Sequence, residues 1–166
     1  MRILGIDPGY AIVGWGVINY ERGRFTPVDF GAVTTAAGRP FGERLQRIYE
    51  ELAAIVAAHK PDVLAIEKLY FQSNKTTAID VAQARGVILL AAEQGGLPVF
   101  EYTPMQVKAA VTGYGQAQKP QVMEMTRRLL RLQHVPKPDD TADALAVAIC
   151  HAQMGGTALK LRLQGG

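Results

Sequence analysis

The sequence predicts an α/β fold in which a mixed sheet of five strands is flanked by helices. Two short apolar runs, residues 2–7 and 63–67, each end in a carboxylate and are bounded by turn residues. Such runs are typical of strands that are buried on both faces of a sheet. Residues 40–59 lie between them and carry apolar side chains at helical spacing. A strand, a crossover helix and a second strand imply parallel pairing.

The first strand ends at Asp7, which is followed by Pro8 and Gly9. Proline has no N–H group to donate to a neighbouring strand, so regular pairing should stop there. We therefore expect Asp7 at the end of a central strand, where the sheet opens toward solvent. Burying an unpaired charge is costly, so Asp7 should have a partner elsewhere in the chain.

The next two strands are predicted at residues 12–20 and 24–34, with residues 21–23 as a hairpin turn. Gly14 and Gly16 alternate with apolar residues in the first of these strands, so one of its faces lacks side chains. Glycine at such positions often marks the close approach of another backbone or of a ligand.

The rest of the chain adds two more strands and several helices. A long helix is predicted at residues 76–93. Its middle, residues 81–92, is apolar or small nearly all round, so the helix should be buried on more than one side. A second copy of the chain is a candidate for the second side. The remaining predicted elements are a strand at 97–102 and helices at about 105–111, 120–132 and 139–153. This order, three strands followed by alternating helices and strands and then helices, is that of the ribonuclease H-like fold.

Length and composition predict a single domain over residues 1–154, with residues 155–166 as a flexible tail. Apolar residues make up 48% of the chain and charged residues 20%, and the net charge of +3 is compatible with a polyanionic partner. The single cysteine, Cys150, excludes an internal disulfide framework and fits a reducing compartment. We see neither a leader nor a run of membrane-spanning length, and we expect a cytoplasmic protein.

Two carboxylates open the last predicted helix. Asp140 and Asp143 are three residues apart, which places them on one helix face. A structural function is the alternative for these acids, because carboxylates in the first turn of a helix interact favourably with the helix dipole. Asp139 could likewise be the N-cap of this helix. Together with Asp7 and Glu67 at the ends of two strands, Asp140 and Asp143 make four carboxylates on three predicted elements. Hard divalent cations relieve the repulsion between such carboxylates, and two ions about 3.5–4 Å apart can clamp a phosphodiester undergoing hydrolysis.

At these motifs the sequence resembles the RuvC family of bacterial Holliday junction resolvases, over essentially its whole length. The short acidic motifs are weak individually, but their order and spacing are specific together. The residues that carry the resemblance are Gly5 to Gly9, Ile66-Glu67, Gln83 to Gly86, Pro104 to Lys108 and Asp140 to Ala146.

The resemblance implies that Asp7, Glu67, Asp140 and Asp143 are catalytic and bind metal, with two Mg²⁺ ions per site and Mn²⁺ as an alternative. It implies a homodimer that nicks two opposed strands of a four-way DNA junction symmetrically, by metal-activated water, in recombination and repair. It also implies RuvA and RuvB as partners. The family dimerises through the long helix, where the expected contact residues are Ala82, Arg85, Gly86 and Leu89.

Basic and aromatic residues extend the predicted site. Lys108 and Lys119 match family lysines that face DNA at the active site, and each offers a cation for a phosphate or a developing negative charge. Tyr70 stands where the family commonly has phenylalanine and is a candidate to stack on an unpaired base, with Phe71 as a competitor. The further candidates for DNA binding are Lys75 and Arg127.

These additional positions also have ordinary interpretations. The two lysines could be solubilising surface residues, Tyr70 a partly buried loop residue, and the arginines around Arg127 a solvated helix face. We expect His134 and His151 to be structural rather than metal ligands, and Cys150 to be part of the core.

Three other functions remain open from the residues. The first is a nucleotide-binding protein of the sugar-kinase or actin type, although the chain is short for two lobes and shows no second phosphate loop. The second is a module that binds junctions without cutting them, although the presence of all four acids argues against this function. The third is a ribonuclease H-type enzyme that acts on RNA–DNA hybrids, which substrate competition would distinguish.

Overall fold

A five-stranded mixed sheet forms the centre of the computed structural model, which describes residues 1–70 and 75–164 and the side chains of 1–70 and 76–155. The strands are β1 (Arg2–Asp7), β2 (Ile12–Glu21), β3 (Arg24–Thr34), β4 (Val63–Glu67) and β5 (Val99–Tyr102). They lie in the order β3-β2-β1-β4-β5. β1 runs antiparallel to β2 and parallel to β4, which confirms the predicted mixed sheet.

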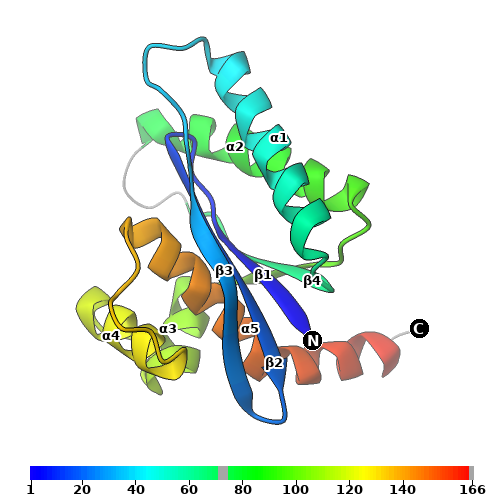
Figure 1. The fold of residues 1–166 in the computed structure, drawn as a ribbon, viewed down its shortest axis with the longest axis vertical. Helices are drawn as coiled ribbons and strands as arrows, with labels where there is room; N and C mark the ends of the chain where they lie inside the picture. The colour runs from blue at the N-terminus through cyan, green and yellow to red at the C-terminus, as the bar shows by residue number, and fades with distance from the viewer. Residues whose placement is uncertain (71–74, 165–166) are drawn as a thin grey trace.

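Helices cover both faces of this sheet (Figure 1). They are α1 (Phe41–His59), α2 (Lys75–Gln94), α3 (Pro104–Thr112), α4 (Lys119–Leu129) and α5 (Asp139–Gln164). Successive side chains of a strand point to opposite faces, so one sheet supplies two cores. Ile3 packs into the core shared with α3, α4 and α5, whereas Leu4 and Ile6 pack into the core shared with α1 and α2.

The glycines of β1 and β2 allow α5 to lie directly on the sheet. Gly5 pairs with Gly16 across the two strands, and Asp7 pairs with Gly14. A Cβ atom on Gly14 would lie 1.9 Å from the carbonyl oxygen of Asp140, and one on Gly5 would lie 2.1 Å from the carbonyl oxygen of Ala144. The bare face predicted from Gly14 and Gly16 is therefore occupied by α5, through its backbone at Gly14 and through the side chain of Leu145 at Gly16.

Two helix ends differ from their predicted positions. α4 ends at Leu129 rather than near Leu132, because Arg131 adopts a left-handed backbone conformation with φ of 54°. α5 continues to Gln164 instead of stopping near Gln153. Gly155 lies within that helix and packs against the ring of His151, where a Cβ atom would lie 2.9 Å from two ring atoms. The flexibility of residues 155–166 stays a prediction.

The helices of the described part of the chain include none that is both long and apolar enough to cross a membrane.

Candidate active site

The acids at the ends of β1 and β4 face the same side of the sheet as α5. Ile6 pairs with Ile66 in the parallel ladder, so Asp7 and Glu67 follow side by side at the same edge. Asp7 has the same parity as Ile3, and Glu67 has the same parity as Ala65, which both belong to the core beneath α5. The sheet register thus delivers two carboxylates to the first turns of α5.

The acids of α5 reach this point because the helix begins above Gly14, the residue that pairs with Asp7. Asp143, Asp7 and Glu67 line one cavity of about 270 Å³, together with Lys108 and Lys119. Asp140 is not among the lining residues, but its charge is close enough to act on the pKa of Asp7. Four predicted acids and both predicted lysines are therefore brought together.

Burial and mutual repulsion change the protonation of the acids. Burial is the largest influence on Asp7, followed by the charges of Asp143, Glu67 and Asp140, and together they raise its pKa well above the ordinary value. Burial and the charge of Asp143 raise the pKa of Glu67, whereas Lys108 and Lys119 act in the opposite direction. Burial likewise raises the pKa of Asp143, although Lys119 opposes it. The site therefore holds an excess of negative charge that favours cations.

Lys119 is the cation in direct contact with an acid of the site. Its Nζ atom donates a hydrogen bond to Oδ2 of Asp143 over 3.1 Å. Partial burial of Lys119 disfavours its charged form, but the hydrogen bond and the charges of Asp143, Asp139 and Asp7 outweigh this effect and raise its pKa. Lys119 is at the first position of α4, and Lys108 reaches the same cavity from α3.

The donor set fits divalent metal ions of the Mg²⁺ type. All four acids offer carboxylate oxygens, the ligands preferred by hard cations. In the part of the chain that the structure describes, no three Asp, Glu, His or Cys side chains already form a ligand cluster. The electrostatic coupling of the acids, rather than a closed ligand shell, is the observation that supports the fit.

Tyr70 lines two further cavities that share residues with the acid cavity. Tyr70 is exposed and lines a cavity of about 620 Å³ with Met105, Gln116 and Lys108. A third hollow joins Tyr70 to Asp7 and Glu67 and includes Lys68, which sequence reasoning missed. Its position directly after Glu67 was the available signal.

For two of the residues predicted to bind DNA, the side chains lie outside the described part of the structure. Phe71 lies outside the described residues. Lys75 is the first residue of α2, and its side chain is also outside the described set. Their roles stay predictions.

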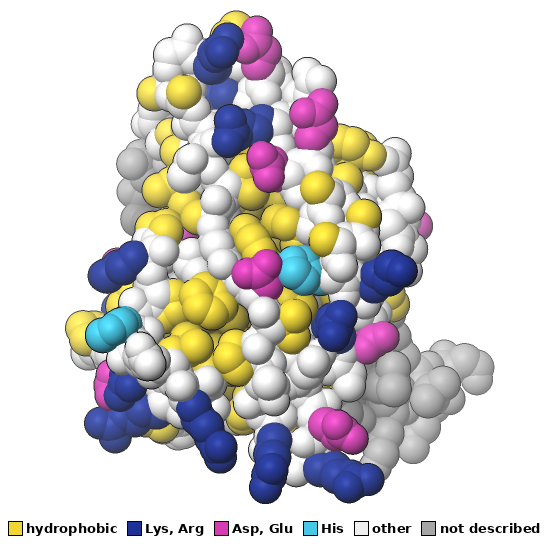
Figure 2. Space-filling model, viewed as in Figure 1, with side chains coloured by type: hydrophobic (Ala, Val, Ile, Leu, Met, Phe, Trp, Pro, Cys, Tyr) yellow, Lys and Arg dark blue, Asp and Glu magenta, His cyan; other side chains and the backbone are white. Residues whose placement is uncertain are grey.

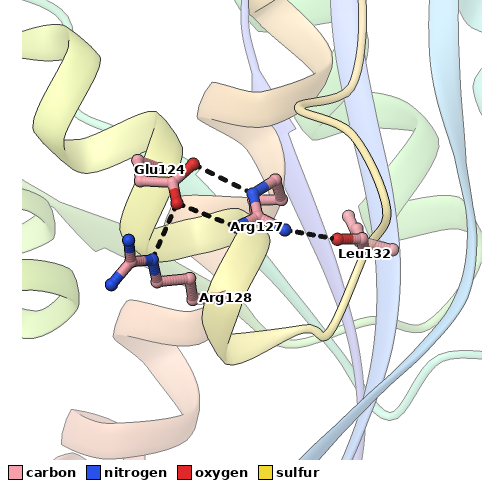
Figure 3. Close-up of polar contacts among 4 residues, drawn as sticks. All are labelled: Glu124, Arg127, Arg128 and Leu132. Carbon is pink, nitrogen blue, oxygen red and sulfur yellow. Dashed lines mark hydrogen bonds and ion pairs between the residues drawn. The ribbon is translucent and has the colours of Figure 1, made fainter.

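Arg127 interacts with its own chain (Figure 3). Its Nε and one terminal nitrogen donate to both carboxylate oxygens of Glu124, at 2.9 and 2.8 Å, and its other terminal nitrogen donates to the carbonyl oxygen of Leu132. Arg128 also donates to Glu124. These contacts join α4 to the segment that follows it, so Arg127 has a structural function, and its contact with DNA stays a prediction.

The predicted dimer residues lie on α2 in different surroundings. Gly86 is exposed, whereas Ala82 and Leu89 are half-buried. Arg85 forms an ion pair with Glu101 of β5, and within the described part of the chain its Nε is the one buried side-chain nitrogen without a hydrogen-bond partner. Arg85 therefore has an attachment within its own subunit.

A buried polar pair supports the sheet beside the site. In the ladder between β4 and β5, Tyr102 lies opposite Glu67. The hydroxyl of Tyr102 lies 2.7 Å from Nδ1 of His151 in α5. Burial lowers the pKa of His151 to about 4 and raises that of Tyr102 to about 12. Both are therefore neutral near pH 7, and the structural interpretation of His151 agrees with this position.

Comparison with known proteins identifies the family. A family model described as "Crossover junction endodeoxyribonuclease RuvC" matches residues 3–151. The protein of that name from Brevibacillus brevis is 59% identical over 153 residues, covering 92% of each chain. The one from Pelotomaculum thermopropionicum is 52% identical over 164 residues, covering 99% of this chain and 100% of the relative.

Solved structures agree with this assignment. The structure of T. thermophilus RuvC in complex with Holliday junction substrate is 34% identical, with a TM-score of 0.87, and the match covers 95% of this chain and 96% of that chain. The predicted ribonuclease H-like fold is thereby confirmed. The chain belongs to the RuvC family of crossover junction endodeoxyribonucleases.

Proposed function

We propose that this chain acts as a homodimeric Holliday junction resolvase that depends on divalent metal ions and nicks two opposed strands of the junction symmetrically. The observation that carries the proposal is the meeting of acids from β1, β4 and α5 with Lys108 and Lys119 at one cavity. The family and the junction-bound relative support junction DNA as the substrate.

The four acids are the proposed metal ligands. Asp7, Glu67, Asp140 and Asp143 would hold two Mg²⁺ ions, with Mn²⁺ as an alternative. When bound, the ions neutralise the carboxylates and activate water for attack on the phosphodiester. The raised pKa values of Asp7 and Glu67 mean that metal binding must compete with protons at these two acids.

Lys108 and Lys119 would hold the scissile phosphate. Both line the acid cavity from helices on one side of it, so a phosphate that approaches the acids also meets two ammonium groups. Hydrogen bonds from these groups to phosphate oxygens orient the phosphodiester and stabilise the charge that develops in the transition state. In this arrangement Lys119 exchanges its hydrogen bond with Asp143 for one with the phosphate.

Tyr70 would orient the DNA beside the cut. Its exposed ring lies between the acid hollow and the larger cavity. An unpaired base stacked on this ring would gain about 1–3 kcal/mol, which suits a substrate whose central bases are opened. Phe71, Lys75 and Arg127 stay additional candidates for DNA contact.

The homodimer would form through α2. Ile79 is 66% exposed and Leu90 is 51% exposed, and Gly86 lies on the same helix face between them. The opposite face of α2 is buried against the sheet through Ala84 and Ile88. A helix that is buried on one face and exposes apolar side chains on the other is typical of a surface that binds a second protein. Cooperation with RuvA and RuvB in the cytoplasm completes the proposal.

Cleavage of a mobile four-way DNA junction in Mg²⁺ tests the proposal. Junctions with several central sequences are needed, because a sequence preference could hide activity. We expect paired, symmetric, ligatable nicks from the parent protein and none from Asp7→Asn. Asp139→Asn is the matched control, since Asp139 is a neighbouring acid of α5 that pairs with Lys137 outside the cavity.

Three results would contradict parts of the proposal. Junction binding without cutting by the parent would make the chain a binding module. Preferential cutting of RNA–DNA hybrids in competition would make it a ribonuclease H-type enzyme. Equal cutting by parent and Asp7→Asn would remove Asp7 from the site.

A further inference from the structure

A second basic site surrounds Arg44 in the first turns of α1, on the sheet face opposite the acids. The Arg44 side chain is only 9% exposed. Its Nε donates to the hydroxyl of Thr35 over 2.9 Å, and this hydroxyl donates to the carbonyl oxygen of Tyr10. The guanidinium carbon lies 4.9 Å from the centre of the Tyr10 ring. These contacts hold the guanidinium group in one position.

The charge of Arg44 has no acidic partner. Among the described residues, no carboxylate forms an ion pair with it, and residues 71–74 and 156–166 contain no Asp or Glu. Its two terminal nitrogens have no hydrogen-bond acceptor in the described part of the chain, and neither is sealed from solvent. These N–H groups are therefore available to a ligand, and an anion that binds them would also compensate the charge of a largely buried cation.

Arg44 lines a cavity of about 350 Å³, together with Thr35, Ala36, Arg39, Glu43 and Arg47. Glu43 is 3.5 Å from Arg39, which leaves Arg44 and Arg47 as an excess of positive charge. A guanidinium fork held by its Nε presents two parallel donors, the geometry that matches phosphate oxygens. The cavity therefore offers the cationic donors that a phosphate group requires.

The cavity lies at the same end of the sheet as the acids. Tyr10 belongs to the turn that follows Asp7, and the backbone N–H of Thr35 bonds to the carbonyl oxygen of Ala11 in the same turn. Figure 1 shows the start of α1 and the segment before it at the top, beyond the turn that joins β1 to β2. Figure 2 shows Lys and Arg side chains on this upper region.

We infer that the Arg44 cavity binds a backbone phosphate of the DNA substrate, away from the scissile phosphate. The inference rests on the proposed function, because it takes the DNA at Asp7 to continue past the turn toward Arg44. Arg44 would supply the paired hydrogen bonds and Arg47 an additional cation at the mouth of the cavity. This contact would help to fix the register of a junction arm while the acids act on another phosphate.

The salt dependence of junction binding tests the inference. Binding is measured in EDTA by fluorescence anisotropy for the parent, Arg44→Gln, Arg44→Lys and Arg47→Gln. The logarithm of the association constant falls linearly with the logarithm of the salt concentration. Each lost phosphate contact should make this negative slope shallower by about 0.9, and so weaken binding about eightfold at 0.1 M salt. We expect this for Arg44→Gln and a smaller decrease for Arg47→Gln. Arg44→Lys should keep the slope while losing affinity.

Lys60→Gln is the matched control, because it removes one positive charge at the other end of α1. It should leave both the slope and the affinity as in the parent. Arg47 is exposed, so its variant folds even if Arg44→Gln does not. An unchanged slope in Arg47→Gln, and in Arg44→Gln where circular dichroism shows a native fold, would overturn the inference.

Two further arms separate the alternatives. Pyrophosphate without DNA tests whether the site serves small phosphate compounds. If it raises the melting temperature of the parent but not of Arg44→Gln, while the DNA slopes stay equal, the assignment to DNA is wrong. Junction cleavage by the parent is followed in parallel. If the parent protein does not cut the junction but its binding of the junction still depends on Arg44, the proposed function is wrong and the phosphate site stands.

Discussion

Lys119 donates a hydrogen bond to Asp143 over 3.1 Å and thereby occupies one of the four carboxylates of the site. The same ammonium group lowers the pKa values of Asp7 and Glu67 through its charge. Lys119 therefore has two effects. It supplies a cation for phosphate, and it keeps neighbouring acids ionised and able to bind metal.

Replacing Lys119 with glutamine should lower the cleavage rate by about 10²-fold, as expected for the loss of one donor to developing charge. It should also raise the pKa values of the acids, so the acidic limb of the pH–rate profile moves to higher pH. Single-turnover cleavage across pH measures both effects. Lys137→Gln, which removes a cation that pairs with Asp139 outside the cavity, should change neither.

Replacing Gly14 with alanine should separate α5 from the sheet. The added Cβ would lie 1.9 Å from the carbonyl oxygen of Asp140, so the helix must move. We expect a loss of about 1–3 kcal/mol or more in the free energy of unfolding, measured by urea denaturation, and a larger loss of cleavage. Gly42→Ala is the control, since a Cβ there meets nothing within 4 Å. Wild-type cleavage by Gly14→Ala would mean that the seating of α5 is not needed for the site.

Removing the charge of Asp7 should stabilise the metal-free protein at neutral pH. Burial and three nearby acids raise its pKa in the folded state. Between the ordinary and the raised pKa the folded chain binds more protons than the unfolded chain, so this contribution to stability falls as pH rises. We expect Asp7→Asn to melt at a higher temperature than the parent at pH 7 in EDTA, by about 2–4 °C for each kcal/mol gained.

The pH dependence provides the internal control for this comparison. The difference should shrink as the pH falls through about 4 and below, because the parent carboxyl is then protonated in the folded state and increasingly also in the unfolded state. Added Mg²⁺ should raise the melting temperature of the parent more than that of Asp7→Asn. A variant that melts below the parent at pH 7 in EDTA would contradict the repulsion described here.

A charge on the exposed face of α2 should separate the proposed dimer. Leu90→Glu would place a carboxylate in the apolar contact of each subunit, and we expect dimerisation to weaken by about 10²-fold or more. Light scattering over a range of protein concentrations measures this change. Val28→Glu replaces another exposed apolar residue, in β3, with glutamate and should leave the mass of the assembly unchanged. A dimer that persists in Leu90→Glu would place the interface elsewhere.

Much of this architecture can be predicted from local patterns. The apolar runs that end at Asp7 and Glu67, the hairpin turn and the helical spacing of α1 depend on neighbouring residues, and the structure confirms all of them. The end of α5 could not be predicted in this way. The predicted helix stops near Gln153, whereas α5 continues to Gln164 and includes Gly155, which packs against the ring of His151.

The sequence by itself determined the fold class, the family and the candidate acids, because strand and helix periods and the order of motifs are properties of a chain read in one dimension. Only the tertiary structure decided which of these groups meet. The pairing of Asp7 with Gly14 positions α5 on the sheet, and the contacts of Arg127 with Glu124 and Leu132 give that arginine a structural function. Among the described residues, Arg44 forms no ion pair, because the neighbouring Glu43 pairs with Arg39. Distances between side chains from separate elements depend on packing, which no local pattern encodes.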